Sequence, residues 1–286
     1  MQITAVDGIG AEITGVDIKS LTDGEFEAIQ SAFADHGVIY VRDQDTTEKD
    51  HIAFAERFGE INVNRFFAAH PDYPEIALVA KDVDQKDNIG GGWHTDHSYD
   101  FEPALGSVLV ARELPESGGD TMFASMYKAY ETLPDELKQK IEGRQALHSG
   151  KHIFGEGAQS YYNTSDAGSH EEGTQRIGNA SVAEALEDPV HPIVIRHPLS
   201  GKKALYVNPA FTRDIVSMEK AESDALLAEL YAHVFKGHDF HHRFKWKPGS
   251  IAMWDNRSTW HWALNDYQGQ RRIMHRITIE GCALAA

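Results

Sequence analysis

The chain has 286 residues, of which 25% are charged and 41% hydrophobic, a composition typical of a soluble globular protein. Its formal net charge of −17 argues against nucleic-acid partners, because phosphate binding needs clustered Lys and Arg. No run of about 18 apolar residues and no basic start before an apolar stretch occurs, so we expect neither a membrane span nor a signal peptide. The single cysteine, Cys282, can form no internal disulfide, and we expect a cytoplasmic protein.

The first sixty residues alternate between helical and strand patterns. Residues 22–36 carry apolar side chains at helical spacing, and Gly37 ends that predicted helix. The apolar run at 38–42 predicts a buried strand. An acid-rich segment that starts at Thr47 predicts a second helix, with Gly59 as its end.

The middle of the chain combines strands with polar segments. Residues 75–80 and 104–114 are predicted strands, and residues 125–133 a short helix. Residues 84–92 are polar and Gly-rich, which predicts a flexible lip before the motif that follows. Residues 155–180 are rich in Gly, Ser and Asn, and we interpret them as a lid or flexible insertion.

The remainder of the chain is mostly β, with one long helix. Strands are predicted at 193–197 and 204–208, a helix at 217–235, and four short strands in the final third. Many short strands without regular βαβ alternation indicate a mainly β protein with flanking helices, either a sandwich or a distorted barrel. The length fits one large domain or two small ones.

Residues 91–100, GGWHTDHSYD, place an imidazole and a carboxylate two positions apart. In an extended segment His94 and Asp96 would point to the same side and converge. A third ligand from a distant strand would complete the two-His, one-carboxylate set of non-haem Fe(II) oxygenases. The alternative is polar residues on an ordinary loop. The spacing alone does not decide, because similar pairs recur in predicted loops at His70 and Asp72 and at His170 and Glu172.

A candidate for the third ligand lies in the C-terminal third. His261 is flanked by Trp260 and Trp262, so strand alternation puts the imidazole on one face and both indoles on the other. A buried core histidine would give the same pattern, so this residue by itself leaves both interpretations open.

The segment 272–279 has two different faces if it is a strand. One face carries Ile273, His275, Ile277 and Ile279, and the other carries Arg272, Met274, Arg276 and Thr278. If the second face looked to water, its arginines would be a solvated charge stripe. If it looked into a barrel mouth, two guanidiniums would point at one cavity, and their burial would require anionic ligand groups.

Several ordered blocks of the chain are similar to one known family. The sequence resembles the taurine dioxygenase group of Fe(II)/2-oxoglutarate-dependent dioxygenases, which act on alkyl sulfonates, alkyl sulfates and aryloxyalkanoates. The resemblance covers almost the whole chain, which implies a single dioxygenase domain over 1–286. The blocks that carry it lie at 10–18, 36–44, 51–61, 93–109, 114–133, 197–212 and 254–279.

The resemblance implies roles for six residues of the site. The expected iron ligands are His94, Asp96 and His261. Thr121 and Arg272 are expected to hold the distal carboxylate of 2-oxoglutarate, whose keto-acid end chelates the iron. Arg276 is expected to face either that keto-acid end or an anionic substrate.

The same resemblance implies a fold and a reaction. The fold is a double-stranded β-helix, or jelly roll, with helices outside it, assembled as a homodimer or homotetramer. The reaction consumes 2-oxoglutarate and O2, releases succinate and CO2, and hydroxylates a C–H bond of a small anionic organic substrate. Related halogenases lack the carboxylate ligand, so the presence of Asp96 favours hydroxylation.

The positions that line the substrate pocket of the family depart in part from its pattern. They correspond to Asn64, Phe67, Gly90, His97, Phe154, Phe211 and Arg276. The phenylalanines at 154 and 211 fit the family's apolar lining, whereas Gly90 replaces a side-chain amide and His97 a small apolar residue. We therefore expect an acid bulkier or less amine-like than taurine: a sulfonate, a sulfate ester, an aryloxyalkanoate or a similar carboxylate.

Two other functions remain open from the sequence. One is a catalytically inert jelly-roll binding protein, and the other is a metal hydrolase that uses the same His/Asp/His site. The first predicts an incomplete ligand set, and the second predicts turnover without oxygen-dependent release of succinate.

Overall fold

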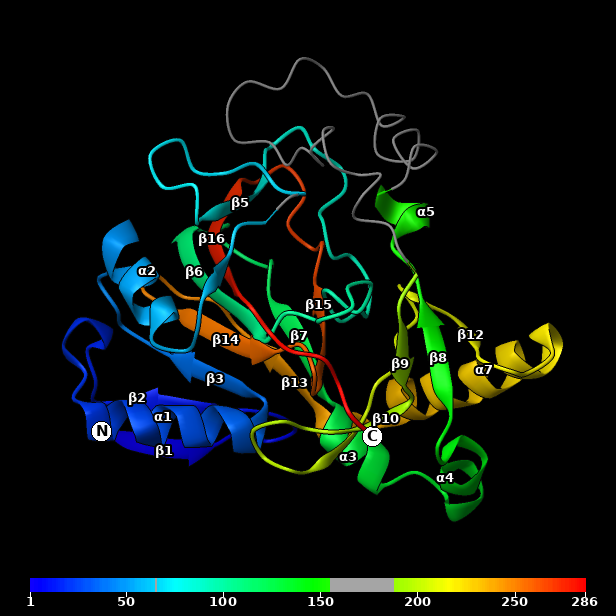
Figure 1. Cartoon of the computed structure of the whole chain (residues 1–286). Coiled ribbons are helices and arrows are strands. Elements are labelled where there is room, and N and C mark those ends of the chain that lie inside the picture. The colour runs from blue at the N-terminus through cyan, green and yellow to red at the C-terminus, as the bar shows by residue number, and fades with distance from the viewer. Residues whose placement is uncertain (65, 155–187) are drawn as a thin grey trace.

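The computed structural model describes residues 1–64, 66–154 and 188–286 (Figure 1). The predicted lid at 155–180, together with His170 and Glu172, lies outside the described residues. Among the residues that are described, no helix is both long and apolar enough to cross a membrane.

The larger sheet has eight strands and forms the left half of Figure 1. Strand β16 pairs with β6, β4 and β5, so the predicted arginine strand lies inside the sheet. In sheet order the strands are β1 (Gln2–Ala5), β2 (Ala11–Thr14), β3 (Val38–Val41), β14 (Ile251–Asp255), β6 (Gly106–Glu113), β16 (Arg272–Ile279) and β4 (Ile61–Asn62), with β5 (Ala77–Lys81) also on β16.

Three smaller sheets make up the rest of the β structure in the residues that the structure describes. The sheet with β7 at its centre stands beside the large sheet in Figure 1 and shares an apolar core with it. The smaller sheets contain, in order, β13 (His241–Phe244), β7 (Thr121–Ser125) and β15 (Thr259–Ala263); β12 (Thr212–Ile215), β8 (Gln145–His148) and β9 (Val190–Pro192); and β10 (Val194–Arg196) with β11 (Lys203–Leu205). The prediction of a mainly β protein with flanking helices is confirmed.

The central strands β3, β6 and β14 of the large sheet are buried almost throughout, which explains why they read as largely apolar runs. On β14, Ile251 and Met253 join the core under the N-terminal helices, whereas Ala252 and Trp254 join the core between the sheets. On β16, Ile277 belongs to the first core and Met274 to the second. The predicted division of the residues of β16 between two faces therefore matches the structure.

The helices cover the outside of the sheets. They are α1 (Asp23–His36), α2 (Glu48–Glu56), α3 (Met126–Glu131), α4 (Asp135–Ile141), α5 (Lys151–Phe154) and α7 (Lys220–Lys236), with 3-10 turns η1 (Ile18–Ser20) and η2 (His238–Phe240). Capping boxes at Thr22 and Thr47 start α1 and α2, and Gly37 with a φ of 73° ends α1 as predicted. Gly59 was the wrong end for α2, because the chain leaves the helix at Arg57 and continues as a turn.

Some elements have no sequence signal strong enough to predict them. The short strands β1, β2, β4, β7, β8, β9 and β12 and the helices α4 and α5 were not predicted. Helix α7 begins at Lys220, three residues later than the predicted start, after Glu219 as its N-cap. Strand β5 begins at Ala77 rather than at residue 75. Each difference concerns a short segment or an element end, where pairing with distant residues decides the structure.

His51 of α2 predicts how stability depends on pH. Its side chain is fully buried against the large sheet, with Nε2 3.1 Å from the carbonyl oxygen of Val108, and burial lowers its pKa to about 3. An unfolded histidine has a pKa of about 6.5, so the unfolded chain takes up this proton first as the pH falls. The stabilisation is complete above about pH 6.5 and is lost progressively toward the folded pKa of about 3.

We therefore expect the free energy of unfolding, measured with urea, to fall between pH 7 and pH 5. The contribution of His51 to this fall is up to about 1.4 kcal/mol per pH unit. His51→Gln, which has no titrating ring, should show a smaller loss over the same range. Equal losses in the two proteins would contradict the role of His51.

Candidate metal centre

A backbone bridge brings His94 to His261. The two residues pair as an isolated antiparallel bridge, with the N–H of each donating to the carbonyl oxygen of the other at 3.1 and 2.8 Å. Strand β15, which carries His261, is itself held by β7. The two imidazole rings lie close together, with centroids 4.1 Å apart and planes tilted by 49°. His94, in the motif at 91–100, thus pairs with His261, which lies more than half the chain length further along the sequence.

Asp96 completes the group. Its Oδ1 lies 3.6 Å from Nε2 of His94, and its Oδ2 lies 3.4 Å from Nε2 of His261. One ligand atom from each of the three residues lies within 4.8 Å of the other two. The Nδ1 atom of His94 lies 2.8 Å from the carbonyl oxygen of Gly92, which favours a proton on Nδ1 and leaves Nε2 free as a ligand. Two imidazole nitrogens and a carboxylate that converge on one position are a ligand set suited to a divalent transition metal.

The protonation states also suit a metal. Burial raises the pKa of the Asp96 carboxyl, but its surroundings, led by the charge of Arg276, outweigh burial and hold this pKa well below its ordinary value. Burial lowers the pKa of His261 well below its ordinary value, so this imidazole is neutral at pH 7. A carboxylate and a neutral imidazole are the forms that bind metals.

Arg276 lies directly beside the three ligands. Its Nη2 donates to Oδ2 of Asp96 at 2.7 Å, and its Nε donates to Oγ of Ser107 at 2.9 Å. The guanidinium also lies over two aromatic rings, 5.3 Å from the centroid of Trp254 and 5.7 Å from that of Phe67. The guanidinium of Arg276 is therefore held at the edge of the site by its hydrogen bonds to Asp96 and Ser107.

Arg272 is a second buried cation in the same strand. It is only 4% exposed, and within the described residues its Nε and Nη2 have no hydrogen-bond partner. Its guanidinium carbon lies 5.8 Å from the ring centroid of Trp246, and the indole N–H of Trp246 donates to Oγ1 of Thr121 at 3.0 Å. Tyr267 and Asp120 offset part of the cost of burying this charge. The two unpaired nitrogens leave room for an anionic ligand group, which would offset more of it.

The predicted aromatic substrate residues lie in one cluster. Phe154 and Phe211 pack with Phe66 and Tyr99, and Phe67 packs against the same cluster. Phe154 stacks on Phe66 with centroids 4.1 Å apart, and Phe211 meets Tyr99 at 4.7 Å. The guanidinium of Arg276 lies over the ring of Phe67. The aromatic cluster is therefore an apolar surface directly beside the charged part of the site.

Three further predicted residues have structural roles of their own. His97, with a φ of 59°, places Nδ1 2.8 Å from a carboxylate oxygen of Asp100. A Cβ at Gly90 would lie 3.1 Å from the ring of His94, so a side chain here would press on that imidazole. The Oδ1 atom of Asn64 accepts hydrogen bonds from the backbone N–H groups of Phe66 and Phe67, which shapes the start of the aromatic segment.

Sequence reasoning missed four residues of this region. Ser107 accepts a hydrogen bond from Arg276, and Trp246 donates one to the hydroxyl of Thr121. Phe66 and Tyr99 form part of the aromatic cluster. Ser107 and Tyr99 fall inside the block 93–109, but an isolated serine or tyrosine has no pattern that indicates a partner. Only the folded chain shows these contacts.

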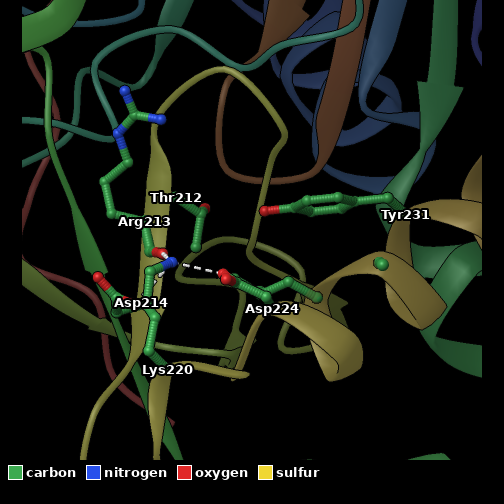
Figure 2. A pocket seen from close by; sticks show the side chains of 8 residues that line it. Thr212, Arg213, Asp214, Lys220, Asp224 and Tyr231 are labelled. Carbon is green, nitrogen blue, oxygen red and sulfur yellow. Dashed lines mark hydrogen bonds and ion pairs between the residues drawn. The ribbon is translucent and has the colours of Figure 1, made fainter. Parts of the chain in front are cut away.

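A pocket of about 470 Å³ lies elsewhere, between β12 and α7 (Figure 2). Its lysine, Lys220, forms ion pairs with Asp214 and Asp224, as Figure 2 shows. The two carboxylates neutralise that cation, and none of the metal-centre residues lines this pocket. We therefore assign the chemistry to the His94, Asp96 and His261 group and not to this pocket.

Facing sheets with two histidines and a carboxylate between them define a jelly-roll protein with the ligand set of non-haem Fe(II) oxygenases. Residues 2–278 match the family described as "Taurine catabolism dioxygenase TauD, TfdA family". The chain belongs to this family of dioxygenases, and the resemblance read from the sequence is confirmed.

Individual relatives agree with this assignment. An alkylsulfatase of Acinetobacter baylyi is 34% identical over 290 residues, which cover 98% of this chain and 85% of the relative. An alpha-ketoglutarate-dependent sulfonate dioxygenase of Saccharomyces cerevisiae is 30% identical over 282 residues and 94% of this chain. The chain spans 64% of the length of that protein and 67% of a related protein of Schizosaccharomyces pombe.

Solved structures confirm the jelly-roll fold. A taurine dioxygenase from Burkholderia xenovorans superposes with a TM-score of 0.80 at 29% identity, over 100% of this chain and 92% of that one. AAD-2, solved in complex with Mn(II) and N-oxalylglycine, superposes with a TM-score of 0.78 at 27% identity, over 98% of each chain.

Proposed function

We propose that this protein is an Fe(II)- and 2-oxoglutarate-dependent dioxygenase that hydroxylates a C–H bond of a small anionic organic substrate. The observation that carries the proposal is the convergence of His94, Asp96 and His261 beside two buried guanidiniums. The family match and the named relatives support the same reaction class.

His94, Asp96 and His261 would hold the iron. When bound, Fe(II) with 2-oxoglutarate and O2 supplies the oxidising power for C–H hydroxylation, with succinate and CO2 as co-products. Three protein ligands leave the remaining coordination positions open for co-substrates. The protein contributes orientation, because a backbone bridge and the Gly92 carbonyl fix the two imidazoles.

Thr121 and Arg272 would bind the distal carboxylate of 2-oxoglutarate. Arg272 offers two unpaired N–H donors in a buried environment, where a charge-assisted hydrogen bond is strong. The indole of Trp246 holds the hydroxyl of Thr121 in place. A carboxylate at this position would offset the cost of the buried guanidinium. N-oxalylglycine, which carries two carboxylates, is bound in the related AAD-2 structure.

The substrate would place its anionic group near Arg276 and its carbon skeleton along the aromatic cluster. Arg276 is fixed by Ser107 and lies over Phe67, so charge and apolar surface adjoin. Phe154 and Phe211 extend that surface. Gly90 offers no side chain to bind an amine, so taurine is disfavoured. An alkyl sulfonate, a sulfate ester or an aryloxyalkanoate fits this combination better, with His97 as a further polar contact.

The two other functions predict different products. An inert binding protein would consume no 2-oxoglutarate, and a metal hydrolase would turn over substrate without O2. The relatives named as dioxygenases favour oxygenase chemistry over both. We further propose that 1–286 acts as one catalytic domain, forms a homodimer or homotetramer and works in the cytoplasm; light scattering of the purified protein tests the oligomer.

The test is a substrate panel of taurine, alkyl sulfonates, alkyl sulfates and phenoxy acids, with Fe(II) and 2-oxoglutarate. We expect O2-dependent succinate release coupled one to one to loss of a panel acid other than taurine. Anaerobic addition of Fe(II) and 2-oxoglutarate should also produce a weak visible charge-transfer band. Absence of both the band and succinate release would refute the dioxygenase, and coupled turnover of taurine alone would refute the substrate assignment.

A further inference from the structure

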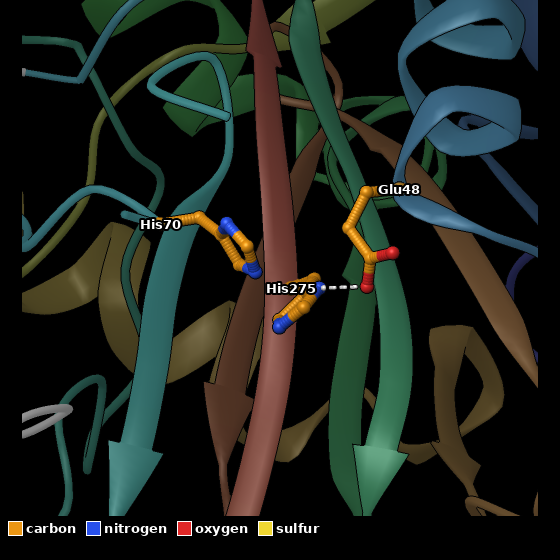
Figure 3. A group of neighbouring side chains, drawn as sticks. All are labelled: Glu48, His70 and His275. Carbon is orange, nitrogen blue, oxygen red and sulfur yellow. Dashed lines mark ion pairs between the residues drawn. The ribbon is translucent and has the colours of Figure 1, made fainter. Parts of the chain in front are cut away.

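A second group of side chains that could hold a metal ion lies on β16, beside the start of helix α2 (Figure 3). It contains Glu48, His70 and His275, with one ligand atom from each residue within 4.8 Å of the other two. In Figure 3 the side chains of Glu48 and His70 approach His275 from opposite sides of the strand. The Nδ1 atom of His275 lies 3.5 Å from a carboxylate oxygen of Glu48, and its ring meets that of His70 at a centroid distance of 5.3 Å.

The three residues belong to separate, anchored segments. Glu48 is the first residue of α2, directly after the capping box at Thr47. His70 precedes β5, where its N–H donates to the carbonyl oxygen of Ile76 at 2.8 Å. His275 lies inside the sheet and is 7% exposed, whereas the other two are half-buried and can be reached from outside. The group is therefore organised by the fold before any ligand binds.

We propose that Glu48, His70 and His275 form a second divalent-metal site, suited to Zn(II), separate from the centre at His94, Asp96 and His261. Two imidazoles and one carboxylate are a common protein ligand set for zinc, which takes water in its fourth position. The sequence indicated His70 only as part of a loop pair with Asp72. In the structure the N–H of Asp72 donates to Nδ1 of His70 at 3.2 Å, so the carboxylate is not its partner in the site.

A neighbouring arginine sets the strength of this site. Arg112 donates from Nε to Nδ1 of His275 at 3.2 Å, and its Nη2 lies 3.6 Å from the carboxylate of Glu48. A metal that binds His275 at Nδ1 must replace this donor, and the guanidinium charge repels a cation. We therefore expect Zn(II) to bind here reversibly and more weakly than at the His94, Asp96 and His261 centre.

The test counts bound Zn(II) by calorimetric titration of the metal-free full-length protein. Wild type should bind two equivalents, the weaker of them at the new site. His70→Ala should lose the weaker equivalent and keep the tighter one, whereas His261→Ala should lose the tighter one and keep the weaker. The double variant should bind none. Glu48→Gln, which preserves the shape of the side chain, should match His70→Ala.

The control is His238→Ala, which removes an exposed histidine that belongs to neither group and should leave two equivalents. Retention of the tighter equivalent shows that a variant is folded. One equivalent in wild type, or an equal count in wild type, His70→Ala and Glu48→Gln, would overturn the second site. Loss of the weaker equivalent in His238→Ala would likewise overturn it, because the metal would then be bound by surface histidines. These counts do not depend on dioxygenase activity.

Discussion

His261→Ala is expected to abolish iron binding and with it the release of succinate. In the proposed centre His261 would supply one of three ligands, and the backbone bridge to His94 holds it in position. Loss of an outer partner of a metal ligand costs about 10- to 100-fold, and loss of a ligand itself costs more. We expect the rate of O2-dependent succinate release to fall by more than about 1000-fold relative to wild type.

Two measurements separate this effect from unfolding. Iron content after anaerobic loading and gel filtration should fall from one equivalent to none, while the circular dichroism spectrum stays that of wild type. Trp260, its neighbour in β15, is anchored in the apolar core by its own side chain, so the strand should persist. His238→Ala serves as the control and should retain iron and activity. A His261→Ala protein with bound iron and half the wild-type rate would contradict the proposed centre.

Arg272→Met is expected to raise the concentration of 2-oxoglutarate needed for half-maximal rate. The side chain is 4% exposed and has two unpaired N–H groups, which we assign to the distal carboxylate of 2-oxoglutarate. Loss of one partner of a buried charge pair costs roughly 2–5 kcal/mol. That cost corresponds to an increase of about 30- to 4000-fold in KM for 2-oxoglutarate.

The same substitution should not destabilise the protein in the absence of ligand. Burial lowers the pKa of Arg272, and this effect outweighs the opposing effects of Tyr267 and Asp120, so the buried charge is only partly compensated in the absence of ligand. Replacement of buried ionic groups by well-packed hydrophobic side chains of similar volume is often neutral or stabilising by about 1–4 kcal/mol. We therefore expect Tm of the ligand-free protein to stay constant or rise, while KM for 2-oxoglutarate increases.

Arg271→Met is the matched control for this prediction. Its side chain is 42% exposed and pairs with Asp82 and Glu113 at the surface, so its removal should leave KM for 2-oxoglutarate within about threefold of wild type. Equal KM values for Arg271→Met and Arg272→Met would show that Arg272 does not bind the co-substrate. A large fall in Tm for Arg272→Met would instead indicate an internal anionic partner for the guanidinium.

Local sequence patterns were sufficient to predict much of the fold. The helices at α1 and α2 have capping boxes and apolar residues at helical spacing, and both features are read within one short segment. The division of β16 into an isoleucine face and an arginine face follows from alternation alone. Short strands such as β8 and β12 have no comparable signal, because their stability comes from pairing with each other and not from their own residues.

By itself, the sequence determined the chemistry available to the chain: the candidate ligands His94, Asp96 and His261, the arginine face of β16, and through ordered blocks the family. Only the tertiary structure decided which groups meet. Ser107 holds Arg276 from 169 positions away, and His70, Glu48 and His275 converge from three segments. The physical reason is that periodicity and capping act over a few neighbouring residues, whereas contacts between distant side chains depend on how whole strands pair and pack.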